Sequence, residues 1–179
     1  MNLALTILDF HAPALFRRKV LCSLISATAQ AFGVEAPSTR GLSTRNLLET
    51  YSLFTREEAE RLWAENRDQS AVERRLFENA SELGAALRRK FHLRSRDDVL
   101  SMSRVLYKIL GITFDGRPDG AIRISECAFS RFYTGPVCRL ISSLDAGAAA
   151  GISGGGRLEF SQRITEGHDC CRARLIFEE

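Results

Sequence analysis

The chain has 179 residues, 45% of them hydrophobic, which is enough to build the core of one domain. Its formal net charge is only +3 and its arginines are scattered, so nucleic acid is not expected as a partner. There is no apolar run of about 18 residues, and Asp9 interrupts the apolar N-terminal stretch, so we expect neither a membrane partner nor a secretion signal. An odd number of cysteines argues against a disulfide framework. We therefore expect one cytoplasmic domain over residues 1–179.

Residues 1–113 have the apolar spacing and the N-terminal signals of successive helices. The clearest helix follows a capping-box pattern, "SAVE", and carries apolar residues at steps of three and four. Four of those residues, Val72, Leu76, Leu83 and Leu87, are expected to be buried. Gly111 and the turn "DGRPDG" end the last helix. The expected helices are 14–32, 44–53, one that begins at the capping box 55–58, one that begins at the box 70–73, and one that begins at the box 95–98.

Residues 120–179 change to a β-α-β-β pattern. "AIRISECAF" is a short β-branched strand, and "YTGPVCRLISSLDAGAAAG" is a helix with Thr134 as its N-cap and Pro136 in its first turn. After the flexible connector "ISGGG", the segments "RLEFSQRIT" and "CCRARLIF" alternate as the two strands of a hairpin. The sequence thus predicts an α+β fold, with a helical first part packed on a small sheet. The strand and hairpin residues expected in the core are Leu158, Phe160, Ile164, Leu175 and Phe177.

A candidate site follows from this order of elements. A strand, a crossover helix and a second strand in one sheet usually run parallel, so both strands end at the edge that also holds the helix N-terminus and the hairpin turn. Ligands favour such edges. Because neighbouring strand residues point to opposite faces, Cys171 rather than Cys170 is expected to face the site. The residues expected at this edge are Cys127, Cys138, His168, Asp169, Cys170 and Cys171.

Three uses of the thiols of Cys127, Cys138 and Cys171 stay open. They are small apolar residues that pack in a core, or they bind zinc or iron together with His168. Alternatively, one of them is a nucleophile, favoured by the helix N-terminus and by His168 as a base that Asp169 or Asp145 orients.

The C-terminal half resembles the L-2-amino-thiazoline-4-carboxylic acid hydrolases. The resemblance lies in a strand ending in cysteine ("RISECAF"), a helix with a second cysteine and an aspartate ("CRLISSLD"), and the closing hairpin "TEGHDCCRARLIF". It implies hydrolysis of a cyclic C–N or C–S bond at Cys127, Cys138 and Cys171, with Asp145 and Gly167 in support. A fainter resemblance, to small-molecule-sensing domains related to 4-vinyl reductases, rests on the same layout of helices, hairpin and late cysteines.

Three functions are therefore compatible with the sequence. The first is a small-molecule hydrolase with a cysteine-centred site made by Cys127, Cys138, Cys171, His168 and Asp145. The second is a non-catalytic sensor domain that binds a small molecule or a metal. The third is an interaction module whose helices present a groove to a partner. The sequence specifies neither the ligand, nor a cofactor such as zinc or iron, nor the oligomeric state.

Overall fold

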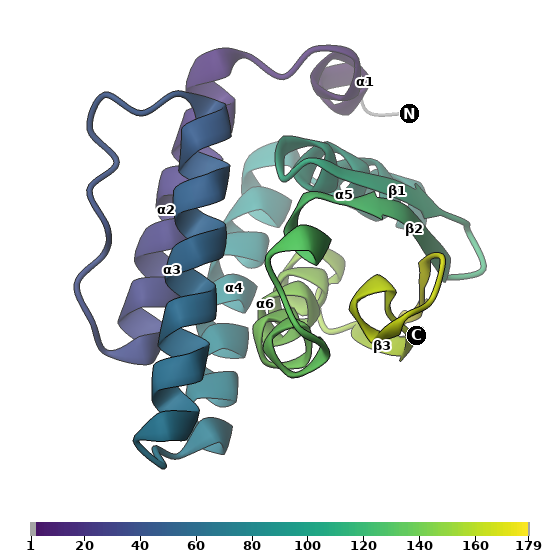
Figure 1. Ribbon diagram of the computed structural model, residues 1–179. Helices are drawn as coiled ribbons and strands as arrows, with labels where there is room; N and C mark the ends of the chain where they lie inside the picture. The colour runs from purple at the N-terminus through teal and green to yellow at the C-terminus, as the bar shows by residue number, and fades with distance from the viewer. Residues whose placement is uncertain (1–2, 179) are drawn as a thin grey trace.

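The described part of the chain, residues 3–178 of a computed structural model, places helices first and the sheet late (Figure 1). The ends of the expected domain, residues 1, 2 and 179, lie outside that part. The helices are α1 (Leu3–Phe10), α2 (Ala14–Phe32), α3 (Thr44–Ala64), α4 (Gln69–Phe91), α5 (Arg96–Ile109) and α6 (Gly135–Ser153). The strands are β1 (Ile112–Gly116), β2 (Ala121–Cys127), β3 (Arg157–Gln162) and β4 (Cys171–Ile176), with short 3-10 helices η1 (Ala128–Arg131) and η2 (Ile164–Glu166). The α+β fold is as the sequence predicts.

The four strands form one sheet in the order β1-β2-β4-β3, and each neighbouring pair is antiparallel. Strands β2 and β3 are both antiparallel to β4, so they run parallel to each other, as predicted, although β4 lies between them. Ile124 near the end of β2 pairs with Cys171 at the start of β4. The end of β2 and the start of β4 therefore share one edge of the sheet, which confirms the predicted placement of Cys127 and Cys171.

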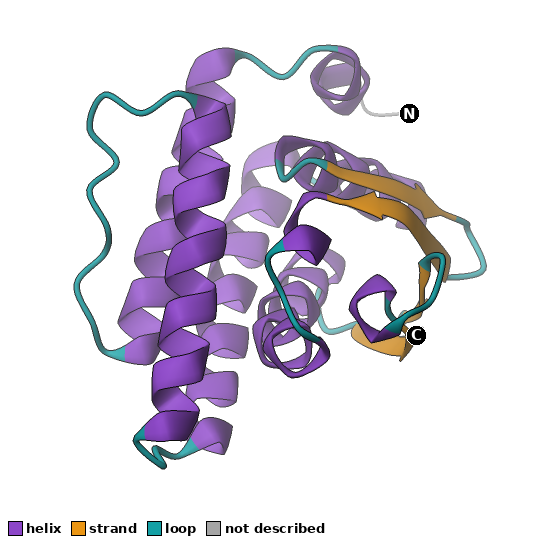
Figure 2. Cartoon of the chain, in the orientation of Figure 1, coloured by secondary structure: helices purple, strands orange, loops and turns teal. Residues whose placement is uncertain are grey.

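One face of the sheet is covered by helices and the other is exposed. Figure 2 shows the strands on one side of the molecule, with α6 between them and the group formed by α2, α3 and α4. Along β4 the burial alternates strictly, with Cys171, Ala173 and Leu175 buried and the arginines between them exposed. This alternation is typical of an antiparallel sheet with one solvated face.

Helices α4 and α6 pack backbone against backbone. A β-carbon at Gly147 would lie 2.1 Å from the carbonyl oxygen of Phe77, and one at Gly151 would lie 2.1 Å from that of Ser81. Only glycine allows so close an approach at these positions. The contact fixes α6 against α4 and leaves the opposite side of α6 to face the sheet.

The predicted break between helices at 44–53 and at 55–58 is wrong, because α3 is continuous from Thr44 to Ala64. Thr55 is buried in its middle, where its hydroxyl bonds the carbonyl of Tyr51 (2.8 Å) and the hydroxyl of Tyr133 (2.5 Å). It therefore satisfies its hydroxyl inside the helix instead of capping a new one. The true N-cap of α3 is Ser43, and Asp68 rather than Ser70 caps α4. The capping box at Ser95 is confirmed, since both of its reciprocal hydrogen bonds form.

The predicted boundary of the helical part at residue 113 is also wrong. Gly111, at φ +68, ends the helical segment, and β1 begins at Ile112 and pairs with β2 as a hairpin. Ile112 and Phe114 are buried while Thr113 and Asp115 are exposed. The sheet region is thus β-β-α-β-β instead of β-α-β-β. A strand of five residues between a helix and a tight turn carries too short an alternation to stand out in the sequence.

The predicted core is confirmed in part. Val72, Leu76 and Leu175 are buried. The other predicted core residues are only partly buried: Leu83, Leu87, Leu158, Phe160, Ile164 and Phe177. Four of them, Leu83, Leu87, Leu158 and Phe160, face an internal cavity. Among the helices described, none is both long and apolar enough to cross a membrane.

Candidate functional site

An elongated cavity of about 180 Å³ lies between α6, the helices around it and the inner face of the sheet, and it is partly open to the surface. Side chains of α6 line it from Cys138 to Ile152. At a rise of 1.5 Å per residue, this stretch of helix spans about 21 Å. The cavity therefore borders α6 over most of the length of that helix.

Most of the lining is apolar. The C-terminal half of α6 contributes Ala148, Ala149 and Ile152, and α4 contributes Leu83 and Leu87. Small alanine side chains leave the space beside α6 unfilled, which is one reason for the cavity. Apolar cavities of about 150 Å³ stay dry and take up apolar guests such as benzene. This end of the cavity is suited to a hydrocarbon group.

The polar groups lie toward the N-terminal half of α6. Asp145 accepts a hydrogen bond on Oδ1 from the hydroxyl of Tyr107, at 3.0 Å. Burial raises the pKa of the Asp145 carboxyl from 3.8 to about 6, and the Tyr107 hydrogen bond and the nearby Arg163 charge only partly oppose this rise. Asp145 is thus a half-buried acid on the cavity wall, and its raised pKa lies close to neutral pH.

Arg163 is the cation that lines the cavity. Its Nη1 donates to the hydroxyl of Ser142 (3.1 Å), and its guanidinium lies 4.1 Å from the centroid of the Phe160 ring. No carboxylate of residues 3–178 pairs with it within 4.0 Å; the ion pairs found there join other side chains. Arg163 is therefore held in place without an acidic partner, on the same side of the cavity as Ser142.

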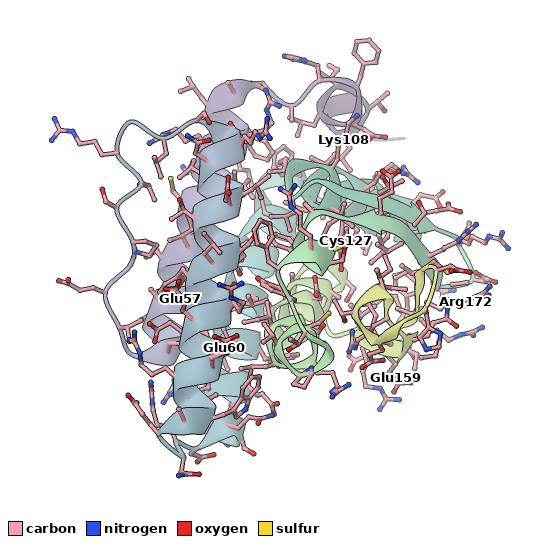
Figure 3. The ribbon with its side chains drawn as sticks, viewed as in Figure 1. Glu57, Glu60, Lys108, Cys127, Glu159 and Arg172 are labelled. Atoms are coloured by element: carbon pink, nitrogen blue, oxygen red, sulfur yellow. The ribbon has the colours of Figure 1, made fainter. Side chains whose placement is uncertain are left out.

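Three thiols, those of Cys127, Cys138 and Cys171, line the same cavity. Figure 3 shows Cys127 toward the middle of the molecule, whereas Arg172 lies at the outer side of the sheet. Cys138 follows the N-cap Thr134 by one helical turn. The cavity is lined by Cys171 and not by its neighbour Cys170, in agreement with the alternation argument.

Burial disfavours the thiolate form of two of these thiols, Cys127 and Cys171. Burial raises the pKa of the Cys127 thiol to about 12, although the backbone N–H groups of Phe129 and Ser130 act in the opposite direction. Burial also raises the pKa of Cys171, whose sulfur accepts the N–H of Ile164 at 3.4 Å. Both thiols are therefore mainly protonated at neutral pH.

The structure does not bring His168 to the thiols. His168 and Asp169 are exposed in the turn between η2 and β4, and neither lines the cavity. Gly167 precedes them in a left-handed conformation, φ +91, that ends η2. Within residues 3–178 no three histidine, cysteine or acidic side chains are grouped so that they could hold a metal ion.

Arg163, Ser142 and Tyr107 line the cavity although the sequence did not single them out. Strict alternation along "RLEFSQRIT" puts Arg163 on the face opposite Leu158 and Phe160, which is away from the predicted core. A β-bulge between Phe160 and Gln162 shifts the register by one residue, so Arg163 lies on the cavity side after all. A better signal was available for Ser142, which precedes Asp145 by three residues and so shares its helix face.

Comparisons with known proteins bear on the fold. No protein-family model matches the chain, and no curated protein matches it. Among solved structures it is similar to a trafficking protein particle complex subunit 3 from Naegleria fowleri, whose crystal structure is described as covalently bound to palmitic acid. The two share 18% sequence identity with a TM-score of 0.52, over 75% of this chain and 99% of that one. At this identity the likeness concerns the fold alone: an α+β domain built of helices and a late sheet.

Proposed function

We propose that this protein is a non-catalytic binding domain for an elongated, largely apolar small molecule, which occupies the cavity along α6. The observation that carries the proposal is the cavity itself, which is apolar over most of its lining and is bordered by a stretch of α6 that rises by about 21 Å. Ligand sites in proteins are typically concave and apolar, with a few polar groups that orient the ligand. Asp145, Arg163 and Ser142 are the polar groups of that kind here.

The similar solved structure supports this proposal. That protein, which has a similar fold, is described as covalently bound to palmitic acid, a molecule with a long hydrocarbon chain. An elongated apolar cavity of this chain would suit a ligand of the same general shape. The low identity means that the attachment and the identity of the ligand do not carry over.

The test is a cavity-filling substitution. N-phenylnaphthylamine, a neutral apolar dye that fluoresces in apolar surroundings, serves as the probe, and Ala148→Phe fills the cavity beside α6. We expect the wild-type protein to bind the dye and Ala148→Phe to bind it at least about tenfold more weakly, a loss of roughly 1.4 kcal/mol. Ala86→Phe, at an exposed position of α4, is the matched control and should bind as the wild type does.

Two results would contradict the proposal. One is that folded wild-type protein fails to bind the dye. The other is that Ala148→Phe, shown by urea unfolding to be folded, binds it as tightly as Ala86→Phe does.

A cysteine-centred hydrolase is the second candidate. The presence of Cys127, Cys138 and Cys171 in one cavity favours it. The raised pKa of Cys127 and Cys171 and the exposed position of His168 oppose it, because a nucleophile needs a thiolate and a base within hydrogen-bond reach. Thiol reactivity as a function of pH separates the two candidates.

A further inference from the structure

Two opposite charges face the polar end of the cavity without pairing. Ser142 and Asp145 lie three residues apart on the cavity face of α6, a spacing that separates β-carbons by about 5–6 Å. Arg163 is fixed against Ser142 by the hydrogen bond at 3.1 Å and lies within electrostatic reach of Asp145. The guanidinium and the carboxylate are nevertheless more than 4.0 Å apart, since they form no ion pair.

Burial keeps four titratable groups around this pair uncharged at neutral pH. Tyr51 from α3 and Tyr107 from α5 face Asp145, and burial raises the pKa of both. The thiols of Cys127 from β2 and Cys171 from β4 are also held protonated by burial. Helix α6 adds the thiol of Cys138, and α2, α4, β1 and β3 contribute no titratable side chain to the lining.

We propose that this end of the cavity receives the carboxyl head of a long-chain carboxylic acid, placed between Arg163 and Asp145, with the hydrocarbon tail along α6. This inference rests on the proposed function and adds the class of ligand. Arg163 has guanidinium donors beyond the one given to Ser142, and a planar guanidinium is suited to a carboxylate. The ligand supplies the acidic partner that Arg163 lacks among the described residues.

Charge balance determines the protonation of this complex. A ligand carboxylate and an ionised Asp145 would place two negative charges beside one guanidinium, which is costly where water is largely excluded. Two neighbouring carboxyl groups avoid this by sharing one proton. The bound state is then neutral: one guanidinium, one carboxylate and one carboxylic acid, with the extra proton taken from solvent.

Other head groups fit less well. An ammonium head would pair with Asp145 but would meet the positive charge of Arg163 on the same side of the cavity. A hydroxyl head bonds to either residue but leaves both charges unpaired. The carboxyl group alone satisfies Arg163 and, by sharing a proton, also removes the isolated charge of Asp145.

A pH dependence follows. Free Asp145 loses its proton near pH 6, so binding of the acid above that pH requires the uptake of one proton. The affinity for the acid should therefore fall by up to about tenfold for each pH unit above about 6. Below about pH 6 Asp145 already holds the proton, and the affinity should level off. An alcohol of the same chain length takes up no proton and should show no such slope.

The experiment compares dodecanoic acid with dodecanol as competitors for bound N-phenylnaphthylamine, from about pH 5.5 to about pH 8. We expect the acid to bind more tightly than the alcohol near pH 6, and to lose about a hundredfold in affinity between about pH 6 and about pH 8. Asp145→Asn should abolish this slope. Arg163→Gln should weaken binding of the acid at least about tenfold relative to binding of the alcohol. Arg172→Gln, on the exposed face of the sheet, serves as the control.

The possible results distinguish the proposal of a carboxyl head group from the proposed binding of an apolar molecule. If the dye binds but acid and alcohol compete equally at every pH, the carboxyl head is refuted and the apolar binding function stands. A wild-type acid affinity that is flat above pH 6, or an Asp145→Asn variant that keeps the slope, refutes the shared proton. If the dye, the acid and the alcohol all fail to bind folded protein, the proposed function itself is refuted.

Discussion

The charge of Asp145 should cost folding stability at neutral pH, and Asp145→Asn should recover it. The pKa of this carboxyl rises from 3.8 to about 6 on folding, because burial disfavours the ionised form. The shift is about two pKa units at about 1.36 kcal/mol each, so the ionised form destabilises the fold by up to about 3 kcal/mol. Asparagine keeps an oxygen that accepts the Tyr107 hydroxyl and removes the charge.

The direction of this pH dependence follows from the number of protons that the folded and unfolded states bind. Between pH 4 and pH 6 the folded state holds a proton that the unfolded state has lost, so the stability that protonated Asp145 provides is lost as the pH rises through about 6. Urea unfolding should show the variant and the wild type to be similar near pH 4, and the variant to be more stable by up to about 3 kcal/mol near pH 7.

Asp169→Asn, at an exposed carboxyl outside the cavity, is the matched control and should change stability by less than about 0.5 kcal/mol at either pH. A difference between Asp145→Asn and the wild type that does not vary with pH would refute the reasoning. So would a variant that is less stable than the wild type at pH 7.

Two further predictions concern the helix contact and the thiols. Gly147→Ala should destabilise the protein by about 1–3 kcal/mol in urea unfolding, because the new β-carbon meets the backbone of Phe77. This cost should exceed the gain from the better helix propensity of alanine. The control is Gly135→Ala, where the nearest atom is a flexible side chain 3.3 Å away, and equal stability of the two variants would contradict the prediction. Near pH 8, Cys127 should react with iodoacetamide far more slowly than an ordinary thiol of pKa about 8.5, and its rate should still rise above pH 9. The rate is measured by peptide mapping with mass spectrometry, and His168→Ala should leave it unchanged. A rate that is already maximal near pH 7 and that falls in His168→Ala would instead favour the hydrolase.

The order of the C-terminal elements was available from the sequence, and with it the place of the thiols. Alternation in "CCRARLIF" shows which side of that strand is buried, and it selects Cys171 over Cys170. The strand–helix–strand rule predicts that β2 and β3 are parallel, and this holds even though β4 lies between them. Local periodicity and handed connections are properties of the chain itself, so they can be read before any tertiary contact is known.

The cavity, by contrast, was decided by tertiary packing. Periodicity identifies Leu83 and Leu87 as inward-facing, but it cannot show that the space before them is left open. Gly147 and Gly151 fix the close approach of α6 to α4, and the small side chains of Ala148 and Ala149 leave space beside α6 unfilled. The position of Arg163 depends on one bulge in β3, which reverses the alternation that the sequence suggests. Void space and a register shift arise from how elements meet, so they emerge only when the whole chain is packed.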